Sequence, residues 1–283
     1  MPNTPERVRE YQVAPRYLAG SIYTGDPGLL PLLDAGWALS RDELGNVIVA
    51  SPDHTLRVGF LPEDERGELW MISAHPHAFA PPEWLVTLDL SAPPEIVGEF
   101  TTALATAHSA EPSSVLGGSA SAGLDVTDRL RASDWVMDNS EPLLLSFESP
   151  DRLVVLRRRV GHLRHEAEAA GDTERWLFEV GPPGHRWYAT ATSNLPDHLL
   201  QALTTAIANP VPVPRHLVRS ELERLPTQAA ATPIAPSPLE VARIQAATAR
   251  SIAAPRPPAS ALAYTTATRP PMPPSFTLAG PTR

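Results

Sequence analysis

Arginine is most concentrated at one place in this sequence, where Arg157, Arg158 and Arg159 are consecutive and Arg164 follows closely. Successive side chains of a β-strand point to opposite faces, so a strand here would place Arg157 and Arg159 on one face. Guanidinium groups in this arrangement can bind phosphates through paired hydrogen bonds. They can equally form ion pairs with the acidic run at residues 63–65. The sequence therefore predicts a binding site for nucleic acid or for an acidic partner, and both remain open.

The other residues that could do chemistry are isolated. His75 and His77 flank a proline with a spacing that could aim both imidazoles at a metal ion, but no third ligand accompanies them. Asp53 and Asp151 recur as a pair of acids, and a turn accounts for both. The chain has no cysteine, which excludes disulfides, thiolate metal sites and cysteine nucleophiles. We therefore expect no catalytic residue, no metal site and no cofactor.

An internal repeat explains the most conspicuous residues. The Trp and Ser-Pro-Asp motifs of the first half recur in the second half, and segment 84–105 aligns without gaps with segment 187–208. Such self-similarity indicates a duplicated structural unit. Trp70 and Trp176 complete three equivalent pairs, which favours a core over an aromatic binding platform. The repeated residues form a structural signature: Trp37, Ser51, Pro52, Asp53, Trp84, Trp135, Ser149, Pro150, Asp151 and Trp187.

Each copy is predicted to be a small α+β unit with an antiparallel sheet. The first copy reads as a helix near 28–35, strands on both sides of the Ser-Pro-Asp turn, and further strands up to residue 90. A closing helix has one apolar stripe from Ile96 to Leu104. The predicted order is helix, about four strands and helix, with an extra leading strand at 16–19.

The chain divides into five segments. An N-terminal arm precedes the first copy, a Ser/Gly/Ala-rich linker joins the copies, and a Pro/Ala-rich tail follows the second copy. We expect the tail to be mostly disordered, apart from a helix at 216–225 and a short capped helix at 238–252. The segments are the arm 1–14, the first module 15–107, the flexible linker 108–123, the second module 124–214, and the C-terminal helix and tail 215–283.

Charge argues against general nucleic-acid binding. The formal net charge is −9, although residues from 215 onward carry eight arginines against three glutamates. The acidic body would repel a phosphate backbone at long range. All 23 basic residues are arginine, which is typical of a GC-rich coding genome. No apolar run is long enough to cross a bilayer and the N-terminus lacks a signal pattern, so we expect a cytoplasmic protein without membrane contact.

The ordered blocks of the repeat resemble a known family. Residues 15–20, the Gly36-Trp37 pair, the Ser-Pro-Asp turn, a Trp-led strand and a helix ending in Thr-Ala-Leu are similar to the DUF317 (SPDY) domain of high-GC actinomycetes. The second copy departs from this pattern at Asp134, which replaces the glycine before Trp, and at Arg152, where the family often has an aromatic residue. The resemblance covers residues 15–214 and implies tandem copies, but no activity.

Three functions are compatible with these features. The first is a non-enzymatic tandem interaction or scaffold module that binds a protein partner with the help of residues 237–283. The second is a nucleic-acid-binding protein that uses the arginine-bearing sheet of the second module. The third is a hydrolase or metal enzyme without a recognisable signature. The missing catalytic constellation favours the first, and an open sheet face that exposes Arg157 would favour the second.

Overall fold

The computed structural model of the chain describes residues 8–22, 24–63, 68–89, 91–117, 124–235 and 237–253. It contains two compact units, Met1–Ile234 and Ala235–Arg283. The second unit holds helix α7 (Pro238–Ala253), close to the helix expected at 238–252. Residues after 253 lie outside the described part, so disorder in the tail stays a prediction. None of the helices described is long and apolar enough to span a membrane.

Both modules have the predicted α+β order, with five strands in each. The first module consists of α1 (Asp26–Asp34), β2 (Ala38–Arg41), β3 (Val47–Ala50), β4 (Leu56–Phe60), β5 (Glu68–Ala74), β6 (Trp84–Asp89) and α2 (Pro94–Ala110). The second consists of α3 (Leu124–Ala132), β7 (Val136–Asp138), β8 (Leu144–Glu148), β9 (Val154–Arg159), β10 (Trp176–Val180), β11 (Trp187–Ala191) and α5 (Asp197–Ala208). A loop insertion between β9 and β10 adds the short helix α4 (His165–Ala169).

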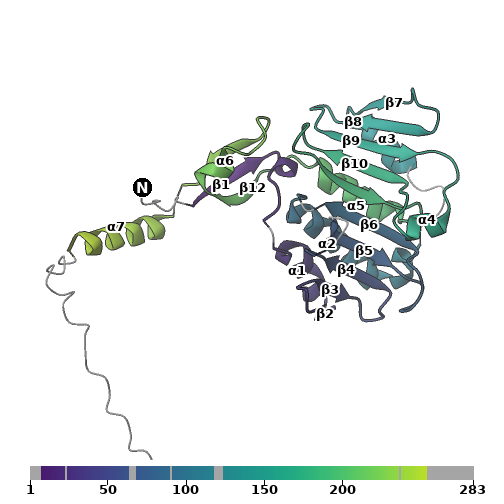
Figure 1. Cartoon of the computed structure of the whole chain (residues 1–283), viewed down its shortest axis with the longest axis horizontal. Coiled ribbons are helices and arrows are strands. Elements are labelled where there is room, and N and C mark those ends of the chain that lie inside the picture. Colours follow the sequence, from purple (N-terminus) through teal and green to yellow (C-terminus); the bar gives the residue numbers. More distant parts are fainter. Residues whose placement is uncertain are drawn as a thin grey trace, which may run out of the picture. The chain divides into compact units, whose positions relative to one another are not determined.

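The two modules share one continuous antiparallel sheet (Figure 1). Its ten strands follow the order β2-β3-β4-β5-β6-β11-β10-β9-β8-β7. The last strand of each module pairs with the other at the centre, where Leu88 faces Ala189 and Val86 faces Ala191. Between these pairs the hydroxyls of Thr87 and Thr190 are 2.7 Å apart. The copies are therefore joined through backbone pairing as one sheet.

One face of this sheet packs on a row of helices, in which α1 contacts α2, α2 contacts α5, and α5 contacts α3. Figure 1 shows the sheet in front of these helices. Alternate strand residues point to them, and a single hydrophobic core runs through both modules. All six tryptophans are buried in it, so the predicted core role is confirmed and an aromatic binding platform is excluded: Trp37, Trp70, Trp84, Trp135, Trp176 and Trp187.

The Ser-Pro-Asp motif forms the predicted hairpin turn. The Ser51 hydroxyl donates to Asp53 Oδ1 at 2.5 Å and accepts the Leu56 amide at 3.0 Å. His54 then adopts a left-handed conformation with φ of 58° and donates its amide to the Ser51 carbonyl. In the second copy Ser149 and Asp151 repeat the side-chain bonds, and the residue after Asp151 has φ of 60°. The motif is therefore a structural device of the turn.

Both ends of the first unit differ from the prediction. The N-terminal arm forms strand β1 (Arg9–Ala14), which pairs with β12 (Val213–Leu217) and β13 (Ala230–Pro233) in a small separate sheet. The helix expected at 216–225 is reduced to α6 (Arg219–Leu222), because β12 takes the preceding residues. These strands pair across about 200 residues of sequence, and a local sequence pattern cannot predict the pairing partner of a strand at such a separation.

Two further segments correct the sequence reading. The leading strand expected at 16–19 is a 3₁₀ helix (Arg16–Leu18), held because the Tyr17 carbonyl accepts the Trp187 indole N–H at 2.9 Å. The start of the linker is anchored, since Val115 is fully buried and its carbonyl accepts the Trp84 indole N–H at 2.7 Å. The rest of the expected linker, residues 118–123, lies outside the described residues.

Candidate interaction surface

The sheet face opposite the α1–α2–α5–α3 row is partly open. Helix α4 packs against β6 from this side. Beyond it, the residues Ile48 and Tyr188 are 38% and 42% exposed, and the side chain of Arg157 is 37% exposed. Leu177 and Thr190 lie between them, half-buried. We call this side, from β3 across to β8, the open face.

The arginine cluster is divided by the strand alternation that the sequence predicted. Arg157 and Arg159 lie on the open face. Arg158 points to the opposite side, where its guanidinium carbon lies 5.3 Å from the centre of the Trp176 ring. Burial and the nearby Arg175 charge lower the pKa of Arg158. Arg164 is exposed at the start of α4. The four predicted binding residues are therefore not one cluster.

The open-face arginines of module two pair with acids of their own module. Arg157 and Arg186 both bind the carboxylate of Glu179, the latter at 3.2 Å. Arg159 binds Glu174 at 2.9 Å. The expected pairing with the acidic run 63–65 stays a prediction, because residues 64 and 65 lie outside the described residues. Cross-strand neighbours on one face supply the nearest countercharge, so the positive charge of this surface is largely neutralised within it.

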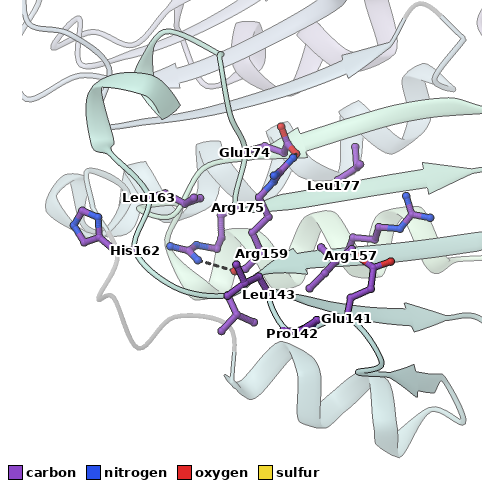
Figure 2. Close-up of a pocket in the computed structure, with 12 residues that line it drawn as sticks. Glu141, Pro142, Leu143, Arg157, Arg159, His162, Leu163, Glu174, Arg175 and Leu177 are labelled. Carbon is purple, nitrogen blue, oxygen red and sulfur yellow. Dashed lines mark hydrogen bonds and ion pairs between the residues drawn. The ribbon is translucent and has the colours of Figure 1, made fainter.

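A pocket of about 580 Å³ lies at the module-two end of the open face (Figure 2). Figure 2 shows Arg159 reaching toward Glu174, while Arg157 extends to the other side. Arg175 closes the base of the insertion by donating to the carbonyls of Arg159 and Gly161 at 2.6 and 2.9 Å. Leu143 and Leu177 add apolar surface. The pocket thus mixes apolar side chains with guanidinium groups that are already held in place.

The two histidines lie in different environments. His75 is buried, and its Nδ1 lies 2.8 Å from the Ala80 carbonyl while its Nε2 lies 3.0 Å from the Ser73 hydroxyl. His77 is exposed in the following loop. Among the residues that the structure describes, no group of three or more His, Cys, Asp or Glu side chains could hold a metal ion.

The two turn aspartates differ in their additional partners. Asp53 Oδ2 lies 3.1 Å from His108 Nε2, whereas Asp151 accepts the Tyr17 hydroxyl. Ser51, Asp53 and His108 are the residue types of a hydrolase triad, but the serine donates to the aspartate and not to the histidine. The acceptor on the serine hydroxyl is a carboxylate whose pKa is lowered, which makes it a weak base, and the imidazole does not take the place that it has in a triad. This cluster therefore supports structure rather than catalysis.

The two turn aspartates are expected to make the stability of the fold sensitive to acid. Burial opposes ionisation of both carboxylates, but the serine hydroxyls and the bonds from His108 to Asp53 and from Tyr17 to Asp151 outweigh it and lower both pKa values. A carboxylate whose pKa is lowered in the folded state stabilises the fold at pH values above its ordinary pKa of 3.8. This stabilisation is lost as the pH falls below 3.8. In urea titrations at a series of pH values, we expect the Asp53→Asn/Asp151→Asn variant to show a shallower loss below 3.8 than the parent. Equal slopes would contradict this role, and Asp128→Asn, at an exposed position, is the control.

These observations define a tandem α+β protein with one fused sheet and a partly open face. The model of the SPDY domain, a domain of unknown function (DUF317), matches residues 50–110 and 148–213, from the Ser-Pro-Asp turn through the closing helix of each module. The chain therefore carries two tandem copies of the SPDY domain. Neither the curated proteins nor the solved structures searched contain a match to the chain.

Sequence reasoning missed the residues that complete the open face. Tyr188 lies between the buried residues Trp187 and Ala189, so its side chain points to the opposite face of the strand. Glu179 stands likewise between Phe178 and Val180. Applied to the second copy, the period-two argument could have found both.

Proposed function

We propose that this protein is a non-enzymatic binding module, that its open face is the working surface, and that its partner is a protein. One observation carries the proposal. The ten-stranded sheet packs its tryptophans on the helix row and leaves Tyr188, Ile48 and the paired Arg157 accessible on the other side. Tyrosine and arginine combine apolar area with polar ends, and both are enriched where proteins bind one another.

The ion pairs of the open face favour a protein over a phosphate backbone. Arg157 shares Glu179 with Arg186, and Arg159 is held by Glu174, so binding phosphates would require breaking pairs that already exist. A protein surface of mixed charge and apolar patches can use these guanidinium groups where they stand. Their fixed positions reduce the side-chain entropy lost on association.

Photo-cross-linking tests the proposal. A benzoylphenylalanine in place of Tyr188, on the open face, is expected to give a discrete protein adduct in the host cell. The same cross-linker at Thr106, an exposed position on α2, is the matched control and should not give that adduct. Resistance of the adduct to nuclease and its re-formation from purified components support a protein partner. No adduct, or an identical one from both positions, would overturn the proposal.

The alternative partner is nucleic acid, favoured by the accessibility of Arg157 on an open sheet. The chain's net charge of −9 and the paired arginines oppose it. We expect no gel shift with duplex or single-stranded oligonucleotides at about 50 mM salt, where electrostatic binding is strongest. A shift that the Arg157→Ala/Arg159→Ala variant abolishes would replace the protein partner by nucleic acid.

A further inference from the structure

A second pocket, of about 350 Å³, lies on the open face of module one. The pocket exists because the two modules carry different residues at two positions that align in the repeat. Module two has Arg157 on β9 and Glu179 on β10, whereas module one has Gly59 on β4 and Ser73 on β5. The smaller residues leave the volume that the Arg157–Glu179 pair fills in the other copy.

Most of this pocket is apolar. Residues from four strands and the following loops line it, and α4 of module two supplies one wall. Both modules therefore contribute to it. The apolar lining residues are Ile48, Leu61, Met71, Pro82, Leu85, Ala169 and Ala170. A volume of this size and an apolar lining with a few polar groups are usual for small-molecule sites.

The polar end of the pocket consists of Arg57, Ser73 and His75. The bond between His75 Nδ1 and the Ala80 carbonyl places a proton on Nδ1, so Nε2 accepts the Ser73 hydroxyl. Burial lowers the pKa of His75, and the charge of Arg57 lowers it further. The imidazole is therefore neutral at neutral pH, and Arg57 is the charged group of the pocket.

Arg57 differs from the other arginines of the open face. Its Nη2 donates to the Ala78 carbonyl, and no carboxylate among the described residues pairs with it. Arg157, Arg159 and Arg186 each have an acid partner. A half-buried guanidinium without a counter-anion, at the end of an apolar pocket, is complementary to an anion that carries an apolar group.

We propose that this pocket binds a small organic carboxylate with an apolar tail. The carboxylate accepts hydrogen bonds from the Arg57 guanidinium, and the tail lies against Ile48, Met71 and Leu85. Because Ala169 and Ala170 of the insertion form one wall, the bound ligand contacts both modules. The pocket shares Ile48 with the proposed protein-binding surface, but Tyr188 does not line it. The octanoate titration and the cross-link at Tyr188 therefore test the two proposals independently.

Methionine methyl NMR on the full chain tests the site, with octanoate as the probe. The chain has four methionines, of which Met71 lines the pocket and Met137 lies on the helix side of module two. The Met71 signal is assigned with Met71→Leu. Octanoate is expected to shift the Met71 signal saturably and leave Met137 unchanged, and octan-1-ol at equal concentration is expected to bind at least about tenfold more weakly.

Two variants separate recognition from folding. Arg57→Gln is expected to weaken octanoate binding at least about tenfold, whereas the control Arg159→Gln on the same face retains it. Gly59→Leu fills the pocket without changing Arg57 and is expected to abolish the shift. Its new Cβ would lie 3.2 Å from the flexible Leu61 side chain, and module two carries arginine at this place. An unshifted Met71 in the parent, equal binding of octan-1-ol, or full binding by Gly59→Leu would overturn the proposal.

Discussion

Replacing Trp84 by alanine is expected to lower the free energy of unfolding by about 3–5 kcal/mol. Trp84 is fully buried on β6, the strand that pairs with β11 at the seam between the modules. The change removes a large side chain from a close-packed core and leaves the Val115 carbonyl without the indole N–H that it accepts at 2.7 Å. Urea unfolding followed by circular dichroism measures the loss.

The same experiment tests whether the modules unfold together. Because β6 and β11 pair at the centre of one sheet, we expect a single transition for the parent and for Trp84→Ala. Leu30→Ala, at a half-exposed position on α1, is the control and should change stability by about 0.5 kcal/mol or less. Two separate transitions, with the second module unaffected by Trp84→Ala, would contradict the fused sheet.

Arg215→Ala is expected to cost about 3 kcal/mol, the second largest effect. The Arg215 side chain is 3% exposed and binds Glu95 of α2 through two bonds of 2.6 and 2.7 Å. It also donates to the carbonyls of Ala19 and Gly20. Its loss would leave the Glu95 carboxylate without its countercharge and detach β12 from the helix row.

An exposed pair provides the comparison for this prediction. Arg131→Ala removes an ion pair with Asp128 in which the side chains are 51% and 72% exposed. Surface pairs of this kind contribute about 0–1 kcal/mol. In thermal unfolding, we expect a clearly larger loss of stability for Arg215→Ala than for Arg131→Ala. If Arg215→Ala lost no more stability than Arg131→Ala, β12 would not depend on this contact.

The features that the sequence predicted well are local or repeated. The Ser-Pro-Asp turn depends on bonds within five residues, so its residue types suffice to indicate it. The tryptophans alternate in phase with apolar neighbours, and the second copy supplied an independent check for each of them. Strand alternation also placed Arg157 and Arg159 on one face, as the structure has them.

The features that escaped prediction depend on long-range pairing. The partner of Arg157 became visible only with the register of β9 and β10, which puts Glu179 within reach. The small β12-β1-β13 sheet joins the two ends of a unit of more than 200 residues. Arg16 looked like part of a strand, but it is buried and donates to the Ala206 carbonyl of α5. No local periodicity encodes these contacts.

The copies share their scaffold and differ in their accessible residues. Glu95 and Glu99 of α2 bind Arg215 and Arg16, and α5 has no acid at the equivalent places. On the open face, one copy carries Arg157 paired with Glu179, and the other carries Arg57, which donates to the Ala78 carbonyl and has no acid partner among the described residues. The turn and tryptophan residues that the copies share determine the sheet and its core. The residues of the open face can differ between the copies because they do not pack in that core.

The fused sheet buries its tryptophans on one side, and we propose that it binds a partner with the other. Hydroxyl-radical footprinting of the full chain measures side-chain access on both sides directly. We expect rapid oxidation of Tyr188 and of the exposed Phe79, and slow oxidation of the six tryptophans. Addition of the partner found by cross-linking should protect Tyr188 and leave Leu30 on α1 unchanged. Oxidised tryptophans, or a Tyr188 that the partner does not protect, would contradict the account.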